Sequence, residues 1–233
     1  MGETLIEAAN ENPDTEVTST HDAGDDLTAA FKNVDVTIDF TVHHFTSEVL
    51  KNALMTNTPL VIGTTGHTDD ERAAIVSASE KLPVVYAPNF SVGVNTLFYL
   101  TRKAAQILDN DHFDIEVTEM HHRHKIDAPS GTARRLLDIL NEETQTSYDN
   151  NVTHGRVGNI GARPNQEIGM HTLRGGDVVG DHTVMFATDG ERFELTHKAS
   201  SRMTFASGAV RAAVWLQTQP AGLYDMQDVL NLK

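Results

Sequence analysis

Short apolar runs alternate with helical segments through the first half of the chain, and this alternation constrains the fold more than any other feature. Residues 34–41, 60–62 and 83–87 are rich in apolar or β-branched side chains, which is typical of strands. Residues 43–55 and 69–81 carry apolar side chains at helical spacing. Strands that alternate with helices in this way predict right-handed βαβ units and a parallel sheet.

The start of the chain departs from that order. Residues 3–12 have a helical pattern, and residues 16–20 predict a short strand. Doubly wound sheets usually begin with a strand and a glycine-rich turn ahead of their first helix. We therefore expect a first strand and most of that turn to precede residue 1; the alternative is that the helix is simply the first element.

The second half of the chain has a different pattern. Residues 113–120 alternate as a strand, and residues 149–165 are rich in glycine and asparagine and predict a loop. Three further alternating runs, separated by the turn sequences GGD and TDG, indicate a mainly antiparallel sheet. These runs are residues 167–174, 178–187 and 192–198. With helices predicted at residues 94–108, 130–143 and 205–217, a parallel α/β domain is followed by an α+β domain.

Charge and composition exclude several classes of protein. Asp and Glu total 33 against 18 Lys and Arg, and the resulting net charge of −15 argues against a nucleic-acid partner. No apolar run approaches the ~20 residues that span a bilayer, and no pattern of a signal peptide is present, so we expect no membrane partner. Cysteine is absent, which excludes disulfides, thiolate catalysis and cysteine zinc sites and fits a reducing cytoplasm.

The densest cluster of chemically active side chains follows the strand predicted at residues 113–120. The segment EMHHRHKIDAPSGT, which begins at Glu119, holds three histidines, a lysine and an arginine. Ligands of α/β folds bind at the carboxyl ends of strands, and a histidine there can donate or take a proton near neutral pH. We expect acid–base chemistry on an anionic substrate, with a solvated basic loop as the alternative.

Metal binding by the same segment is a weaker hypothesis. Neighbouring residues of an extended chain point to opposite sides, so His121, His122 and His124 cannot all face one ion. A zinc site would need two of these histidines and a third ligand from elsewhere in the chain. We therefore predict no metal.

The residues after the histidines suit a carboxylate or a phosphate. Lys125 supplies a positive charge, or a proton if its pKa is lowered. Ser130, Gly131 and Thr132 enter a predicted helix, whose N-terminus offers free N–H groups and the positive end of a dipole. Ser130 taken alone is explained equally well as an ordinary N-cap.

Two loops lie where a nucleotide would bind in such a sheet. The first follows one predicted strand and consists of Gly63, Thr64, Thr65 and Gly66, with Thr68 as the expected N-cap of the next helix. The second follows the next strand and consists of Ala87, Pro88, Asn89 and Phe90. Phe90 could stack on a ring or pack in the core. Asp22 is an acidic residue of the type that binds the ribose 2′-hydroxyl of NAD.

Several long motifs, in order, carry a family resemblance. The segment EMHHRHKIDAPSGTA closely resembles the signature of the 4-hydroxy-tetrahydrodipicolinate reductases, also called dihydrodipicolinate reductases. Further motifs extend the resemblance along nearly the whole chain. They are IDFT from Ile38, VIGTTG from Val61, NFSVGVN from Asn89, RGGDVVGDHTVMF from Arg174 and HKASSRMTFASGAVRAAVWL from His197.

The resemblance implies a two-domain enzyme of diaminopimelate and lysine biosynthesis. Such enzymes reduce 4-hydroxy-tetrahydrodipicolinate, a small ring dicarboxylate, to tetrahydrodipicolinate with NADH or NADPH. A Rossmann-like dinucleotide-binding domain would comprise residues 1–91 and 202–233. An α+β domain of residues 92–201 would bind the substrate and build a homotetramer through its mainly antiparallel sheet.

The resemblance also implies residue roles. His121 matches the family's proton donor, and Lys125 matches a second proton donor that also meets the substrate. The expected substrate contacts are His122, Lys125, Ser130, Gly131 and Thr132. The expected cofactor contacts are Met1, Asp22, Gly63, Thr64, Thr65, Ala87, Pro88, Asn89, Phe90 and Arg202. Some members carry an arginine after the acidic residue, and Ala23 at that place predicts a preference for NADH.

Two other functions compete with the reductase. A metal-dependent hydrolase built on the histidine cluster is weakened because the sequence has no HExxH or comparable motif. A nucleotide-binding or structural oligomer without catalysis would follow if the expected loss of the glycine-rich turn abolishes cofactor binding. The intact set of His121, Lys125, Gly131 and Thr132 argues against that alternative.

Overall fold

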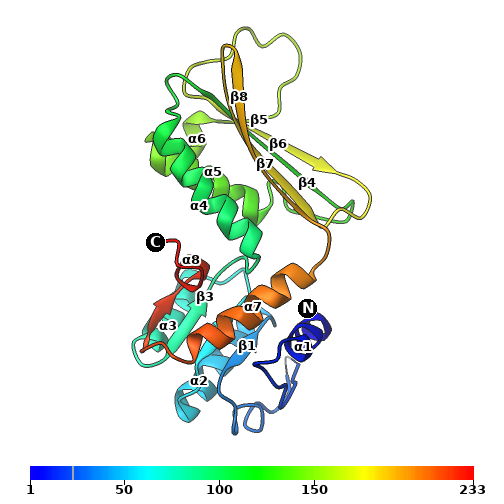
Figure 1. The fold of residues 1–233 in the computed structure, drawn as a ribbon, viewed down its shortest axis with the longest axis vertical. Helices are drawn as coiled ribbons and strands as arrows, with labels where there is room; N and C mark the ends of the chain where they lie inside the picture. Colours follow the sequence, from blue (N-terminus) through cyan, green and yellow to red (C-terminus); the bar gives the residue numbers. More distant parts are fainter. Residues whose placement is uncertain (23) are drawn as a thin grey trace. The chain divides into compact units, whose positions relative to one another are not determined.

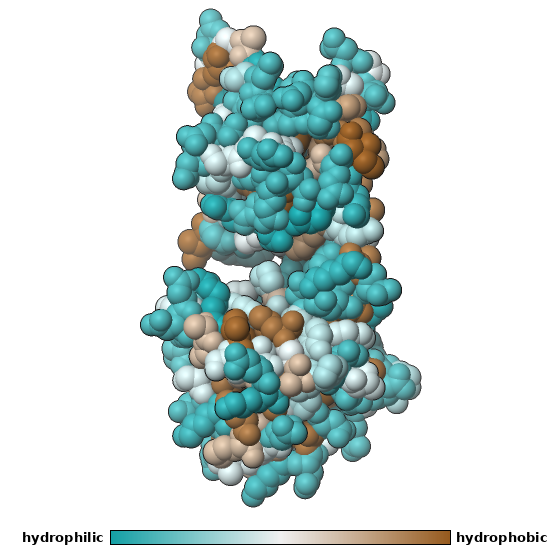
Figure 2. Space-filling model, turned by 90° about the vertical axis from the view of Figure 1, so that its left-hand side faces the viewer, coloured by the Kyte–Doolittle hydropathy of each residue, from teal (hydrophilic) through white to brown (hydrophobic). Residues whose placement is uncertain are grey.

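The computed structural model describes residues 1–22 and 24–233, which form two compact units (Figure 1). Unit 1 comprises Met1–Val92 and Arg202–Lys233, and unit 2 comprises Gly93–Ser201. The chain therefore leaves the first unit, builds the second and returns. On the face that Figure 2 shows, hydrophilic residues predominate and apolar residues form small separate groups, as the net charge of −15 leads one to expect.

Unit 1 is built on a parallel sheet with the strand order β1-β2-β3-β9. Its strands are β1 (Thr37–Asp39), β2 (Leu60–Ile62), β3 (Pro83–Tyr86) and β9 (Gly222–Tyr224). All three strand pairings are parallel, as the alternation of strands and helices predicts. The buried run of β2 and β3 is typical of a sheet that is covered on both faces.

Helices cover both faces of this sheet. Leu60 and Ile62 pack with α2 (Thr46–Thr56) and α3 (Asp69–Ser79) on one side. Val61 packs with α7 (Met203–Leu216) and α8 (Met226–Val229) on the other. The first helix, α1 (Gly2–Glu11), lies beside α7, as Figure 1 shows. Within the described residues, no helix has both the length and the apolar character that crossing a bilayer requires.

Most local predictions for unit 1 are confirmed, two predicted segments differ, and β9 and α8 were not predicted. Thr68 caps α3 in a capping box with Glu71, in which Glu71 N lies 3.3 Å from Thr68 Oγ1. The short turn η1 (His43–Phe45) precedes α2 in the segment predicted as one helix. The strand predicted at residues 16–20 is wrong. Val17 is its only apolar side chain, and most of the others are exposed, so pairing would bury little apolar surface.

Unit 2 contains a mixed sheet with the order β5-β6-β4-β7-β8. Its strands are β4 (Asp114–His121), β5 (Val152–His154), β6 (Ile168–Arg174), β7 (Gly180–Thr188) and β8 (Glu191–Ala199). The pairings β4-β7 and β7-β8 are antiparallel, and β7-β8 is the longest register in the sheet. The pairings β4-β6 and β5-β6 are parallel. The run at residues 167–174 therefore pairs with β4 and not with β7, its neighbour in sequence.

One core holds unit 2 together. Helices α4 (Val92–Ile107) and α5 (Gly131–Thr144) lie side by side on one face of the sheet (Figure 1), where Arg102 of α4 bonds to Glu142 and Glu143 of α5. Ser130 caps α5 as predicted, with Ala133 N 3.2 Å from its Oγ. The loop predicted at residues 149–165 is partly wrong, because it includes most of α6 (Tyr148–Asn151) and all of β5.

Candidate active site

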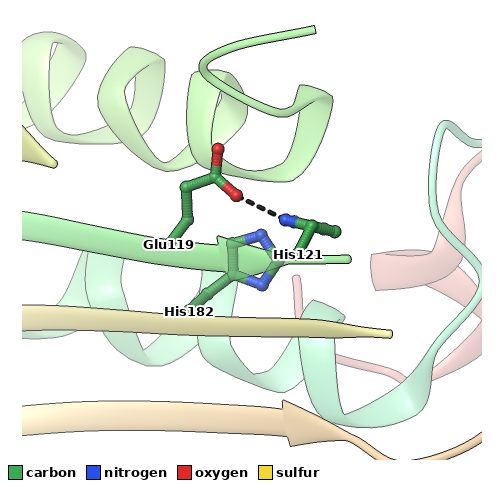
Figure 3. A group of neighbouring side chains, drawn as sticks. All are labelled: Glu119, His121 and His182. Carbon is green, nitrogen blue, oxygen red and sulfur yellow. Dashed lines mark hydrogen bonds and ion pairs between the residues drawn. The ribbon is translucent and has the colours of Figure 1, made fainter. Parts of the chain in front are cut away.

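The end of β4 carries two polar side chains on the buried face of its sheet. Successive residues of a strand point to opposite faces, and the buried face of β4 runs through Ile115 and Val117 to Glu119 and His121. His182 of β7 lies directly opposite Glu119 in the antiparallel register. Glu119 is fully buried, and His121 and His182 are nearly so. Figure 3 shows these three side chains gathered between the strands and the helix layer.

Glu119 is surrounded by hydrogen-bond donors. Its Oε2 accepts a hydrogen bond from His121 Nδ1. Its Oε1 accepts from Ser130 N at 3.1 Å and from Arg174 Nη2 at 2.9 Å. Burial by itself would raise the pKa of Glu119, but the bonds from His121, Arg174 and Ser130 lower this pKa to about 2. The carboxylate is therefore ionised at every physiological pH.

His182 is held as a neutral ring. Burial, followed by the nearby charge of His121, lowers the pKa of His182 to about 3. Its Nε2 lies 3.2 Å from Ser130 Oγ, and its ring meets that of His121 edge-on with centroids 5.1 Å apart. Nδ1 of His182 is buried and has no hydrogen-bond partner among the described residues. His182 is therefore a buried, uncharged side chain that packs beside the ring of His121.

The same three side chains could in principle hold a metal ion. One ligand atom from each of Glu119, His121 and His182 lies within 4.8 Å of the others. This set differs from the three neighbouring histidines considered from the sequence, of which His122 is half-buried and His124 exposed. A cation would compete with Arg174 and with the Nδ1 proton of His121 for the one carboxylate. The donor set therefore favours a hydrogen-bonded acid–histidine pair over a metal centre.

The turn after β4 carries Lys125, four residues after His121. His122 N donates to Val178 O at 2.7 Å, and Lys125 N donates to His122 O at 3.1 Å, so backbone bonds fix the turn. Lys125 Nζ lies 2.8 Å from Asp127 Oδ1. Burial would raise the pKa of Asp127, but the bond and charge of Lys125 lower it overall. Arg174 also donates to Asp127 O at 2.6 Å and thereby connects this turn to Glu119.

The start of α5 is open to a ligand. Gly131 is exposed, and a Cβ at this position would meet no atom within 4 Å. Thr132 is half-buried in the first turn of the same helix. Ser130 is buried and uses its side chain as the N-cap, so its role as a cap is confirmed. Exposed helix N-termini of this kind attract carboxylates and phosphates.

The loops that follow β1 and β2 in unit 1 are held together by one carboxylate. Buried Asp39 accepts the hydroxyl of Thr64 at 3.1 Å through Oδ2 and both the N–H and the hydroxyl of Thr41 through Oδ1. A Cβ on Gly63 would overlap the ring of Phe40, so only glycine fits there. Thr65 and Gly66 are exposed at this edge, and Gly66 has a φ of +88°.

The loop after β3 lies at the same edge of the sheet. Ala87 is buried, Pro88 is exposed and Asn89 is half-buried. Phe90 is buried and packs on Phe40 with ring centroids 5.5 Å apart, so its side chain belongs to the core and does not offer a stacking face. A Cβ on Gly208 of α7 would overlap Phe90 O, which shows how closely α7 approaches this loop.

The remaining predicted cofactor residues lie elsewhere in unit 1. Met1 is half-buried against the cluster formed by α1 and α7. Asp22 is exposed in a turn that Asp22 N closes by donating to Asp25 Oδ2 at 2.8 Å. Ala23, on which the NADH preference rests, lies outside the described residues. Arg202 is exposed at the N-cap of α7.

Sequence reasoning missed Glu119, Arg174 and His182 as site residues. A signal for Glu119 exists, since it precedes His121 by two residues on a strand and must share its face. No local signal identifies His182 or Arg174, because the registers of β7 and β6 against β4 bring them there. These non-local pairings are visible only in the folded chain.

The fold and the site define a class of α/β proteins with two units, in which a parallel sheet of the nucleotide-binding type accompanies a mixed sheet that carries a buried acid–histidine pair. The family model described as "Dihydrodipicolinate reductase, N-terminus" matches residues 1–90, and the model described as "Dihydrodipicolinate reductase, C-terminus" matches residues 93–230. The chain belongs to the dihydrodipicolinate reductase family.

Individual relatives agree with this assignment. A 4-hydroxy-tetrahydrodipicolinate reductase of Akkermansia muciniphila is 64% identical over 232 residues, which cover 100% of this chain and 94% of the relative. The enzyme of the same name from Neisseria meningitidis serogroup B is 47% identical over 100% of this chain and 94% of its own. A dipicolinate-bound dihydrodipicolinate reductase from Paenisporosarcina sp. TG-14 shares the fold, with a TM-score of 0.77 at 24% identity over 97% of this chain and 94% of that one.

Proposed function

We propose that this chain is an NAD(P)H-dependent 4-hydroxy-tetrahydrodipicolinate reductase of diaminopimelate and lysine biosynthesis. Full-length relatives with that activity in their names are up to 64% identical to it. The observation that carries the proposal from the structure is the buried Glu119–His121 pair, which stands next to a lysine-bearing turn and an open helix N-terminus. These groups together suit proton transfer to an anionic substrate.

The substrate's chemistry matches these groups. The ring carries two carboxylates. Lys125 supplies a cation, and the exposed start of α5 supplies the positive end of a helix dipole, which attracts carboxylates. We assign His122, Lys125, Ser130, Gly131 and Thr132 to substrate binding. Ser130 contributes by holding the start of α5 in place, since its side chain caps the helix and its N–H bonds to Glu119. The dipicolinate bound to the Paenisporosarcina enzyme is a planar dicarboxylate ring of the same chemical class.

The cofactor would be held by unit 1. Its residues fit a dinucleotide, because the loops after three adjacent parallel strands meet at one edge, where Gly63 permits no side chain and the exposed residues Thr65 and Gly66 can approach a phosphate or ribose. We assign Gly63, Thr64, Thr65, Ala87, Pro88, Asn89 and the backbone of Phe90 to this role, together with Met1, Asp22 and Arg202. NAD(P)H, when bound, supplies the hydride that reduces the ring.

The protein's own chemical step is the delivery of a proton. The overall reaction adds a hydride and a proton to the ring and releases the 4-hydroxyl group as water. After that loss and the addition of the hydride to the conjugated ring, the electron-rich ring carbon needs a proton. A protonated His121 releases its Nε2 proton to that carbon while Nδ1 remains bonded to Glu119. The neutral imidazole that remains takes a proton from water for the next turnover. Lys125 acts as a second proton donor and as the cation that holds the substrate.

We also propose a homotetramer in the cytoplasm, as the family resemblance implies. The open face of the mixed sheet carries the alternate residues of β4, β7 and β8, among them Thr118, Thr183 and Thr196, and lies opposite the helix layer. This face is the surface of unit 2 that the proposal assigns to contacts between copies.

Binding experiments test the function without requiring turnover. NADH is titrated into the chain by fluorescence or calorimetry, with and without 2,6-pyridinedicarboxylate, a planar mimic of the substrate. The proposal predicts that NADH binds and that the mimic tightens its binding. A folded chain that binds neither compound would contradict the proposal.

A further inference from the structure

We infer that Glu119 is a positioning residue for His121: it fixes the proton on Nδ1 and thereby makes Nε2 the nitrogen that exchanges a proton with the substrate. The inference rests on the proposed function in one respect, namely that His121 is the proton donor. It goes further by assigning a role to a buried carboxylate outside the proposed substrate and cofactor contacts and by specifying which nitrogen reacts.

The position of Glu119 allows this role. Glu119 and His121 are two residues apart on β4 and share its buried face, so their side chains stand side by side as Figure 3 shows. Glu119 Oε2 and His121 Nδ1 make a hydrogen bond. An ionised carboxylate can only accept. Nδ1 is therefore the donor whether the His121 ring is neutral or charged, and the proton that comes and goes is the one on Nε2.

The other oxygen of Glu119 is anchored from two sides. Ser130 N lies 3.1 Å from Oε1, and Arg174 Nη2 lies 2.9 Å from it. These donors hold the carboxylate in one orientation and keep it ionised inside the protein. Because Glu119 cannot rotate away without leaving both donors unpaired, the Nδ1–H of His121 always has its acceptor in place.

The surroundings of His121 leave Nε2 as the reacting nitrogen. Among the described residues, no hydrogen bond engages Nε2. A Cβ on Gly180 would lie 2.9 Å from Nε2, so the absence of a side chain at this position makes room for the ring. The titratable and charged groups that face His121 are Glu119 on β4, Arg174 on β6 and His182 on β7. His182 stays neutral and does not compete for the proton.

The anchoring also connects Glu119 to the substrate residues. Arg174 uses the same Nη2 group to bond Glu119 and Asp127 O, and Asp127 in turn pairs with Lys125. Ser130 N belongs to the start of α5, where the substrate carboxylate is proposed to bind. The carboxylate that orients His121 is thus held by the same segment that is proposed to bind the substrate. This shared anchor fixes the position of the proton donor relative to the substrate.

The first measurement is the tautomer of His121 in the wild-type chain. Nitrogen-15 NMR of labelled histidines, assigned by loss of the signal in His121→Ala, distinguishes a proton on Nδ1 from one on Nε2. The inference predicts that the neutral ring of His121 carries its proton on Nδ1. A neutral ring protonated on Nε2 would overturn the inference, and this readout does not depend on turnover.

The second measurement compares Glu119→Gln with Glu191→Gln. Glu191 is an exposed carboxylate at the start of β8 in the same unit, and the same change of charge there is the control. In Glu119→Gln we expect kcat to fall roughly tenfold to a hundredfold, the effect of losing one hydrogen bond to a charged group, with a smaller change in the substrate KM. The pH profile of kcat should also differ from that of the wild type, because the variant lacks the negative charge beside His121. Glu191→Gln should leave kcat and the substrate KM within about twofold of the wild-type values.

A conservative variant guards against misfolding. Glu119→Asp keeps the negative charge. It should recover part of the wild-type kcat, and the pH dependence of its kcat should resemble that of the wild type. If Glu119→Gln and Glu119→Asp both retain the wild-type kcat and pH profile, the inference is overturned. A wild-type chain that binds NADH but does not reduce the substrate would instead refute the proposed function, and the tautomer of His121 would still decide whether Glu119 orients that ring.

Discussion

Thr64 donates its hydroxyl to Asp39 across the ends of two neighbouring parallel strands, with Oγ1 3.1 Å from Oδ2. The other oxygen of Asp39 accepts from Thr41 N at 2.9 Å and from Thr41 Oγ1 at 2.6 Å. One buried carboxylate therefore sets the positions of two loops at the edge where the cofactor is proposed to bind. Asp39 belongs to the motif IDFT. The motif alone does not show that this carboxylate holds the two loops in place.

Replacing Asp39 tests the cofactor loops. Asp39→Ala leaves three donors without their acceptor, so we expect the free energy of unfolding to fall by about 1–3 kcal/mol. Since Thr64 is no longer held, KM for NADH should rise roughly tenfold. Asp35→Ala, at an exposed site shortly before β1 and outside the carboxylate's bonds, is the control and should change neither quantity. A folded Asp39→Ala variant with an unchanged KM for NADH would show that the loops do not need this tie.

Replacing Lys125 tests the substrate site. Lys125→Ala removes the cation of the turn after β4, so we expect KM for the dicarboxylate substrate to rise at least tenfold and kcat to fall as well. Affinity for NADH should not change, because Lys125 belongs to unit 2. Arg123→Ala, an exposed cation in the same turn, should have a much smaller effect. Equal losses in the two variants would indicate a general effect of charge rather than a specific contact.

His182 should make the stability of the chain depend on pH. Its pKa is about 3 in the folded chain and about 6.5 when unfolded, so below pH 6.5 the unfolded chain binds a proton that the folded chain does not. Stability therefore falls as pH drops from about 6.5 towards 3, by up to about 1.4 kcal/mol per pH unit for this one proton. The variant His182→Gln lacks this titratable imidazole. Urea unfolding at pH 7, 6 and 5 should show a shallower pH dependence for His182→Gln, and identical slopes would contradict the assignment.

The preference for NADH is a separate prediction. It rests on Asp22, which is exposed and able to meet a ribose hydroxyl, and on Ala23, where some family members carry an arginine that meets the 2′-phosphate of NADPH. We expect kcat/KM to be higher with NADH than with NADPH, and Ala23→Arg to shift the ratio towards NADPH. A clear preference of the wild-type chain for NADPH would contradict this prediction and show that another group binds the 2′-phosphate.

The elements that could be predicted are those fixed by local sequence. The parallel strands of unit 1 follow from apolar runs between helices, and Thr68 and Ser130 follow from N-cap chemistry. The strand predicted at residues 16–20 failed because β-branched residues alone do not form a strand without apolar surface to bury. The short strands β5 and β9 have too few residues to show a period.

The candidate site could be predicted from the sequence only within one continuous segment. His121, Lys125 and the helix start are close together in sequence, so one motif indicates all of them as candidates. The two-residue period of β4 could have placed Glu119 on the same face as His121. The bonds that hold its carboxylate come from Arg174 and Ser130, which belong to other elements. His182 enters through the register of β7 against β4. The parallel pairing of β6 with β4 likewise depends on a crossover that no local pattern specifies.

The central claim is that His121 supplies the proton for reduction of 4-hydroxy-tetrahydrodipicolinate. The most direct measurement follows NADH oxidation by wild type and by His121→Ala, with substrate produced in place by dihydrodipicolinate synthase. We predict steady turnover by the wild type and a kcat about 10²–10⁴ lower in His121→Ala, with NADH affinity nearly unchanged. Turnover by His121→Ala at the wild-type rate would contradict the account.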